Sequence, residues 1–197
     1  MNLQKLRPQE KLVNVNNRLG NDFLRTMQGT TKMVYDTLQV LPGQNVYQFF
    51  KDTNTRTFPF CNVKNDSLPV AESLSVQRIS LSVLDETSDL TGLTYKILPI
   101  QGIVTNLELS DLSLKIANDV VMKPIAVQHF LPEYNKNATN ENLEIFEMNT
   151  DMVIPPQLDF SFELRVFNLV NTSETNKVYL RLIVEGVGAQ FNGKTNF

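Results

Sequence analysis

Apolar and polar residues alternate with a period of two over much of the chain after residue 32. The clearest stretches cover residues 74–84 (LSVQRISLSVL) and 158–166 (LDFSFELRV). Such alternation is typical of β-strands that bury one face. Further strands are predicted at residues 33–40, 46–50, 112–127, 143–148 and 178–187. Counting 112–127 as a hairpin, we expect about eight strands.

Turn residues separate these strands. Pro42-Gly43 predicts a turn after the first strand, and Asn118-Asp119 predicts the turn of the hairpin. No run of 10–15 residues with helical periodicity separates the strands, so a parallel βαβ sheet is disfavoured. The pattern therefore predicts an all-β fold, an antiparallel sandwich or barrel.

The alternation also predicts which side chains share a face. Over residues 74–84 it groups Leu74 and Val76 with Arg78, opposite Ile79. Over residues 158–166 it places Leu158 on the same face as four further apolar side chains, Phe160, Phe162, Leu164 and Val166.

Residues 1–31 follow a different, helical pattern. Apolar residues recur there every three or four positions, as on one face of an amphipathic helix, with Gly29 as a natural end. These residues are Leu12, Val15, Leu19, Phe23 and Met27. We expect an N-terminal arm over residues 1–31 with a short amphipathic helix, a β domain over 32–190 and a C-terminal tail over 191–197.

The charge is unevenly divided between these parts. The net charge of the 197 residues is −3, but residues 1–32 carry six bases against two acids, a net +4. The remaining residues carry twelve bases and nineteen acids, a net −7. A basic arm on an acidic body predicts contact with a polyanion. The candidate contacts are Lys5, Arg7, Lys11, Arg18, Arg25 and Lys32.

The composition excludes several kinds of site. With one His, one Cys and no Trp, one copy of the chain has neither a disulfide nor a metal centre built from several imidazoles or thiolates. We identify neither a secretory signal in the first residues nor an apolar run of membrane-spanning length, and expect a soluble protein. We predict no catalytic residues, no cofactor and no metal.

Three features resemble chemical motifs without completing them. Residues 188–195 (GAQFNGKT) match the phosphate-binding pattern G-x-x-x-x-G-K-S/T, but only two residues follow to form the helix that this loop requires. His129 has no nucleophile motif beside it. Cys61 lies among aromatic residues and is predicted to be a small buried hydrophobe.

Two groups of acidic residues leave alternatives open. Asp85, Glu86 and Asp89 are predicted to lie in one acidic loop (DETSDLTG), and whether that loop binds a cation stays open. The second group is Glu141, Glu144 and Glu147, which would alternate between faces on a strand. We expect both groups to be solvated.

Several stretches together resemble a known family. They are the basic arm, FFKDTNTRTFPFCNV, the strand LSVQRISLSVL, the hairpin LSLKIANDVVMKPIAV, the segment MVIPPQLDFSFELRVFN and the closing strand VYLRLIVEGVGAQ. In this order they resemble the jelly-roll capsid and virion structural proteins of tailless icosahedral bacteriophages. The resemblance covers most of residues 32–190 and implies a single antiparallel jelly-roll sandwich in which two sheets face each other.

The resemblance implies a structural function and no enzymatic activity. The protein would be a capsid subunit, either of the major shell or of a vertex, made in the host cytoplasm and located in the virion. Its partners would be further copies of itself and other capsid proteins. The arm would lie on the inner side, its basic residues toward the viral nucleic acid or an internal membrane and its apolar face against a neighbouring subunit.

Two alternatives remain from the sequence. One is a carbohydrate-binding or receptor-binding β-sandwich, such as a fibre or adhesin head. The other is a jelly-roll glycoside hydrolase that uses the region around Glu141, Glu144 and Glu147, which would need two carboxyl groups in one cleft.

Overall fold

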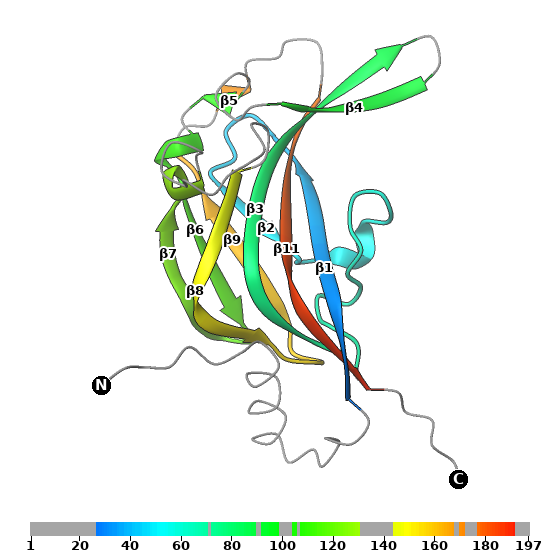
Figure 1. Cartoon of the computed structure of the whole chain (residues 1–197). Coiled ribbons are helices and arrows are strands. Elements are labelled where there is room, and N and C mark those ends of the chain that lie inside the picture. The colour runs from blue at the N-terminus through cyan, green and yellow to red at the C-terminus, as the bar shows by residue number, and fades with distance from the viewer. Residues whose placement is uncertain are drawn as a thin grey trace.

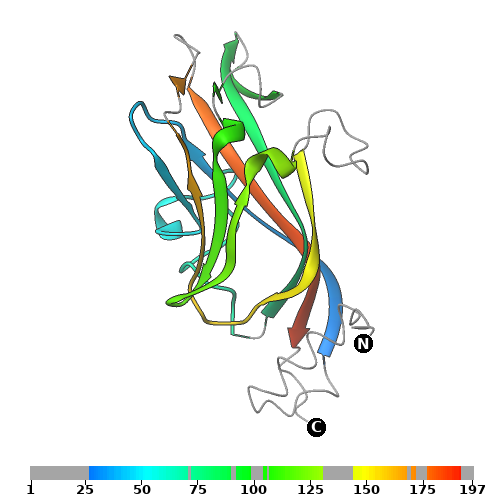
Figure 2. The same cartoon turned by 90° about the vertical axis from the view of Figure 1, so that its left-hand side faces the viewer.

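Two antiparallel β-sheets stacked face to face form the body of the protein (Figures 1 and 2). A computed structural model describes residues 27–70, 72–89, 92–98, 104–105, 107–130, 144–167, 170–171 and 177–191. Its long strands are β1 (Met27–Gln39), β2 (Val46–Phe49), β3 (Glu72–Asp89), β4 (Gly92–Leu98), β6 (Asp111–Ile116), β7 (Asp119–Ala126), β8 (Glu144–Ile154), β9 (Phe160–Arg165) and β11 (Val178–Phe191). Short elements are β5 (Val104–Thr105), β10 (Val170–Asn171) and the 3-10 turns η1 (Thr53–Thr55), η2 (Leu107–Leu109) and η3 (Val127–Phe130). The prediction of an all-β antiparallel sandwich is confirmed.

The first sheet has β11 between β1 and β3, and the second has the order β2-β9-β6-β7. The free edge of β3 is shared by two strands. Residues 74–81 of β3 pair with β8, and residues 83–89 pair with β4. A two-residue pairing of β5 with β10 stands apart from both sheets.

Four strand pairs are nested in the sequence. β1 pairs with β11, β2 with β9, β3 with β8, and β6 with β7. The chain is therefore arranged as one long hairpin. Its successive strand pairs lie alternately in the first and the second sheet. β11 also pairs with β3, and β9 with β6, and these contacts join the strand pairs within each sheet.

The core lies between the sheets and is rich in aromatic side chains. Tyr47, Phe49 and Phe50 from β2 and the residue after it are fully buried, as is Phe162 from β9. The Phe50 ring centroid lies 5.0 Å from that of Phe160. Burial of an apolar side chain of this size stabilises a fold by about 1.5–3 kcal/mol, so this cluster links the 50–70 loop to the sandwich.

The N-terminal boundary differs from the one predicted. β1 begins at Met27, five residues before the expected start at residue 32, and it pairs with β11 in continuous register from Met27↔Phe191 onward. Met27 and Gly29 therefore lie in a strand and do not end a helix. The physical reason is that β11 extends to Phe191 and offers backbone partners for these residues. The rest of the predicted helix lies outside the described residues.

The Pro42-Gly43 turn is also used differently. The strands on both sides of it exist, but they belong to different sheets, because β1 pairs with β11 and β2 pairs with β9. The turn thus carries the chain from one sheet to the other. The hairpin turn in 112–127 is placed one residue earlier than predicted, at Ala117 and Asn118, because Ile116 pairs with Asp119. Ala117 adopts a φ of 52° there.

A β-bulge changes the predicted faces of β3. The register shifts between Val76 and Arg78 against both neighbours, so Leu74 and Val76 share the core with Ile79 and Leu81. Strict alternation had predicted that Ile79 and Leu74 point to opposite faces of the strand. The bulge inserts one residue, which reverses the alternation and keeps Arg78 outside. A similar correction applies to Leu158, which is exposed because it precedes β9.

The acidic loop is in fact a strand. β3 continues to Asp89, so Asp85, Glu86 and Asp89 lie in β3 and pair with β4. The sequence DETSD has low strand propensity, and the tertiary pairing with β4 and β11 overrides it.

Candidate functional site

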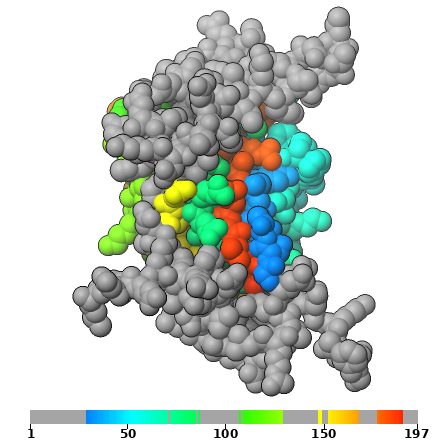
Figure 3. All heavy atoms as spheres, viewed as in Figure 1, coloured from blue at the N-terminus to red at the C-terminus, as the bar shows by residue number. Residues whose placement is uncertain are grey.

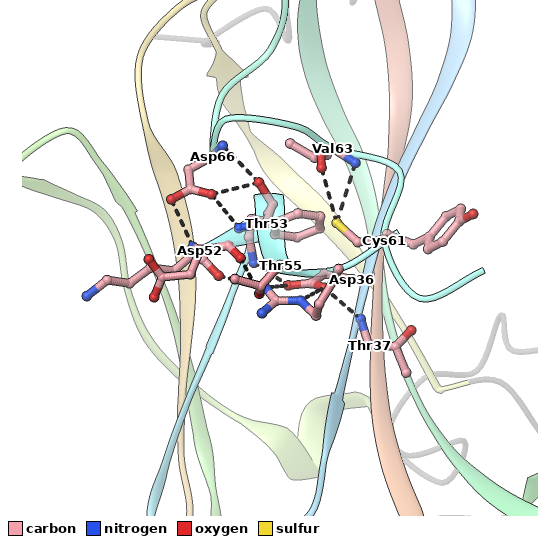
Figure 4. Close-up of polar contacts among 12 residues, drawn as sticks. Asp36, Thr37, Asp52, Thr53, Thr55, Cys61, Val63 and Asp66 are labelled. Carbon is pink, nitrogen blue, oxygen red and sulfur yellow. Dashed lines mark hydrogen bonds and ion pairs between the residues drawn. The ribbon is translucent and has the colours of Figure 1, made fainter. Parts of the chain in front are cut away.

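A buried carboxylate organises the loop of residues 50–70, which connects β2 to β3 (Figure 4). Asp36 on β1 is fully buried. Its two carboxylate oxygens accept hydrogen bonds from Arg56 Nε and Nη2, each at 2.8 Å. They also accept bonds from the amides of Thr37 (2.9 Å) and Phe50 (2.6 Å). A charge this deeply buried is stable only with such a complete set of partners.

A second carboxylate fixes the same loop from its other end. Asp66 accepts hydrogen bonds from the Thr53 amide (2.7 Å), the Thr53 hydroxyl (2.7 Å) and the Asp52 amide (2.9 Å). Partial burial would raise the pKa of Asp66, but these hydrogen bonds outweigh it and lower the pKa. The loop includes left-handed backbone at Asp52, Asn65 and Asp66 itself, and the hydrogen bonds stabilise that conformation.

The loop covers part of the outer edge of β1. The Asn62 side chain accepts a hydrogen bond from the Tyr35 amide (2.8 Å) and donates one to the Met33 carbonyl (2.9 Å). A β-bridge joins Asp36 to Cys61. These contacts satisfy backbone groups that an edge strand would otherwise leave free for another chain.

Cys61 has the character predicted for it. Its side chain is 4% exposed, and burial raises the pKa of the thiol to about 11. At neutral pH almost no thiolate forms, so this group is a poor nucleophile.

A cavity of about 560 Å³ lies beside this loop at one end of the sandwich. It is lined by Lys32, Met33, Val34, Asn62, Val63, Lys64, Asn65, Ser67, Leu68, Pro69 and Glu72. Lys32 forms an ion pair with Glu72 there. The lining contains no aromatic ring on which a sugar would stack.

The position of Lys32 explains why a glycine stands at position 188, the first residue of the phosphate-binding pattern. Lys32 lies on β1 and Glu72 on β3, with β11 between them. A Cβ atom at Gly188 of β11 would lie 2.7 Å from the Lys32 Cβ atom, so glycine makes room for the lysine side chain. Residues 188–191 are extended and paired with β1, so their backbone does not form a phosphate loop.

The outer face of the first sheet carries cross-strand rows of side chains. One row consists of Met33, Glu185, Arg78 and Glu147, in which Arg78 Nε lies 2.7 Å from Glu185 Oε1. Another row contains Thr37, Arg181 and Ser82. The Arg181 guanidinium lies 4.0 Å from the centre of the Tyr35 ring, a cation–π distance.

Most basic side chains in the described part of the body have acidic partners. The paired residues are Lys32, Arg56, Arg78, Lys115, Arg165 and Lys177. In the second sheet, the hydrogen bond from Lys115 Nζ (2.7 Å) lowers the pKa of Glu163. Because these charges are neutralised within the chain, the described body carries no strong basic patch.

The predicted site residues are distributed as follows. Lys5, Arg7, Lys11, Arg18 and Arg25, with Leu12, Val15, Leu19 and Phe23, lie outside the described residues. Lys32 faces the cavity and is neutralised by Glu72, so a polyanion would have to compete with Glu72 for it. The backbone of His129 belongs to η3.

Of the two acidic groups, the structure describes the side chains of Glu86 and Glu147. Glu86 accepts a hydrogen bond from the Tyr179 hydroxyl (3.1 Å) and lies 4.0 Å from Lys177 Nζ. Glu144 and Glu147 belong to β8, where the Glu147 side chain is exposed, and Glu141 lies outside the described residues. Within the described residues, no group of three His, Cys, Asp or Glu side chains could hold a metal ion.

The sequence reasoning missed the Asp36–Arg56 pair. A signal was present, since Asp36 occupies the same face of the alternating strand as Val34, which is a core position. An acid at such a position requires a buried partner. That the partner is Arg56 depends on the fold of the 50–70 loop.

Comparison of the chain with protein-family models gives no match, and neither does comparison with curated protein sequences. The part of the chain that the structure describes includes no helix of the length and apolarity needed to cross a bilayer.

Proposed function

We propose that the protein is a structural virion subunit that assembles into a capsid through a jelly-roll sandwich. The observation that carries this proposal is the nested pairing of β1 with β11, β2 with β9, β3 with β8 and β6 with β7. A long hairpin rolled into two facing four-stranded sheets in this order is a jelly roll. Viral capsids are among the main users of this fold, together with lectins and cupins. On this assignment β4, β5 and β10 are additions to the eight-stranded framework.

Exposed apolar side chains supply the second support. Phe58, in the 50–70 loop, is 82% exposed, and Val120 and Val121 are exposed on the edge strand β7. Single exposed apolar residues are common, but an exposed aromatic side chain and an open strand edge are both suited to contact with another protein. In an ordered assembly, neighbouring subunits would cover them.

The charge distribution supports the orientation of the subunit. The acidic body has most of its described basic side chains paired, whereas five further bases lie in residues 1–26. The arm is then the part that faces the nucleic acid or an internal membrane, and the body forms the shell.

The size of the particles formed by the full-length chain tests the proposal. Light scattering and negative-stain electron microscopy, over a range of protein and salt concentrations, should show a discrete ring or shell of many subunits. A monomer under all conditions would contradict it. A monomer that binds defined oligosaccharides on a glycan array would instead favour the carbohydrate-binding alternative.

A further inference from the structure

One end of the outer face of the first sheet is completely buried. Ser73 and Ser75 on β3 are 0% exposed, and Ala189, the cross-strand neighbour of Ser73 on β11, is 1% exposed. The two serine side chains point away from the core, because Leu74 and Val76, which alternate with them, point into it. Figure 3 views this face, on which β8, β3, β11 and β1 lie side by side.

The described elements do not account for this burial. The second sheet packs against the opposite face, and Figures 1 and 2 show no described strand or turn over the end of β3 that carries Ser73 and Ser75. The methyl group of Ala189 reaches no farther from the sheet than a serine side chain, so it does not cover Ser73. Neither serine hydroxyl has a hydrogen-bond partner among the described residues. An apolar cover from elsewhere in the chain would account for both observations.

The N-terminal arm joins the sheet beside this surface. Gly29 of β1, Ala189 of β11 and Ser73 of β3 form one cross-strand row. Gly29 is therefore two strands, or about 10 Å, from Ser73. Residues 1–26 lead into β1 at this end, and residues 192–197 follow β11 there.

The segment 131–143 joins the sheet far from this surface. It leads into β8 at Glu144, which pairs with Leu81. Leu81 is eight residues, or about 26 Å, along β3 from Ser73. The arm and the C-terminal tail are therefore the nearer candidates for the cover.

Of these two segments, the arm has the apolar surface that a cover requires. Its apolar stripe recurs every three or four positions, as on one face of a helix, and consists of Leu12, Val15, Leu19 and Phe23. A helix over residues 12–23 is about 18 Å long, and the strands β1, β11, β3 and β8 together span about 14 Å across the sheet. So short a helix is marginal in water unless it packs on a surface. The tail, NGKTNF, has one apolar residue, Phe197.

We propose that residues 12–23 of the arm form a helix whose apolar stripe packs on Ser73, Ser75 and Ala189 of the same chain. The helix adds a third layer to this end of the sandwich. Arg18 lies on another face of such a helix, so docking leaves it directed away from the sheet and accessible to a polyanion. This inference does not depend on the proposed function. It places the apolar stripe on the chain's own sheet, where the resemblance implied a neighbouring subunit.

Thiol labelling in the full-length chain tests this docking. Cys61 is the one cysteine of the chain, and it is buried with a thiol pKa of about 11, so it reacts little with a maleimide. Ser75→Cys places a thiol of similar size beneath the proposed helix. Thr31→Cys is the matched control, because Thr31 is an exposed residue in the same cross-strand row as Ser75. We expect Ser75→Cys to be labelled at least about tenfold more slowly than Thr31→Cys.

Substitutions in the arm show whether the stripe is the cover. Leu19→Gln with Phe23→Gln removes half of the stripe, and in this background the Ser75→Cys thiol should react nearly as fast as the Thr31→Cys thiol. Arg18→Gln changes another face of the helix and should leave Ser75→Cys labelling slow. If Cys61 also reacts in the doubly substituted arm, Phe23→Gln alone replaces it with the same expectation. Slow labelling that persists without the stripe would overturn the proposal, as would fast labelling with the arm intact.

Protein concentration separates the chain's own arm from that of another copy. Docking within one chain predicts the same labelling rate of Ser75→Cys at all concentrations, whereas a rate that rises on dilution would show that another copy supplies the cover and would overturn the proposal. The result is also distinct from that of the proposed function. A monomer with slow labelling supports the docked arm and contradicts the capsid, and a shell with fast labelling does the reverse.

Discussion

At the scale of single residues, Asp36 shows how this sandwich holds a charge in its interior. The carboxylate accepts two hydrogen bonds from one guanidinium and two from backbone amides, so each of its oxygens accepts two hydrogen bonds. The amide of Phe50 is one of these donors, and its ring belongs to the aromatic core. The ion pair therefore connects the position of the 50–70 loop to core packing.

Asp36→Asn should destabilise the protein strongly. The variant leaves Arg56 without its counter-charge and turns an NH₂ group toward existing donors. We expect a loss of about 2–4 kcal/mol in the free energy of unfolding, measured by urea denaturation at pH 7. Asp111→Asn is the control, because it removes the same type of pair with Arg165 at an exposed position and should change stability little. Equal effects of the two substitutions would contradict this account.

The lowered pKa of Asp66 predicts a pH dependence with a definite sign. Because its folded pKa lies below the ordinary value of 3.8, Asp66 stabilises the fold fully above that pH and loses this effect as the pH falls through the folded pKa. The difference in unfolding free energy between the wild type and Asp66→Asn should be constant from about pH 5 to pH 7 and shrink below about pH 4. Denaturant titrations at several pH values measure it. A difference that grew in acid would show that the pKa is raised.

At the scale of elements, the bulge in β3 decides which side chains reach the core. It lies beside Gly186 of β11, where an added Cβ atom would be 1.9 Å from the Ser75 carbonyl oxygen. Only glycine permits that approach. The bulge and the glycine opposite it are therefore one structural feature, shared by two strands.

Gly186→Ala should disturb this feature. The added methyl group meets backbone, which cannot move aside as a flexible side chain would, and we expect a loss of about 2–4 kcal/mol in stability. Gly29→Ala in β1 is the matched control, because nothing lies within 4 Å of the added Cβ atom, and its melting temperature should equal or slightly exceed that of the wild type. Thermal unfolding of the two variants compares them directly. A stable Gly186→Ala protein would mean that the strands do not approach so closely.

At the scale of the whole molecule, the division of charge gives the chain two different surfaces. The body carries a net −7 and pairs most of its described bases internally, whereas the arm carries a net +4. An acidic body would repel nucleic acid, so on the proposed function attraction to nucleic acid would have to come from the arm.

Replacing the five arm bases Lys5, Arg7, Lys11, Arg18 and Arg25 with Gln should weaken nucleic-acid binding. On duplex DNA, the plot of log affinity against log salt concentration should become less steep, by up to about 0.9 for each phosphate that the arm no longer neutralises. Fluorescence anisotropy at several salt concentrations measures the slope. Lys123→Gln on the body should leave the slope unchanged, and an unchanged slope in the five-residue variant would rule out the arm as the binding segment.

Much of the fold follows from local patterns in the sequence. Alternation with period two identified strands near 33–40, 74–84, 112–127, 158–166 and 178–187, because a strand half buried in a sandwich must alternate. The character of Cys61 followed from its apolar neighbours. The composition by itself excludes a disulfide and a multi-histidine metal site within one copy, because the necessary residues are absent.

Other features depend on contacts between residues far apart in the chain. The extra length of β1 and β3 arises because β11 and β4 supply backbone partners, and the bulge near Val76 follows from the close approach of Gly186. Asp36 meets Arg56, and Arg181 comes to lie beside Thr37 without a carboxylate, only once the strands are in register. Local sequence determined where the central parts of most long strands form, since those depend on each residue's own propensity and period. Only the tertiary structure decided which strands pair and which charges meet, because register and burial are properties of the assembled sheets.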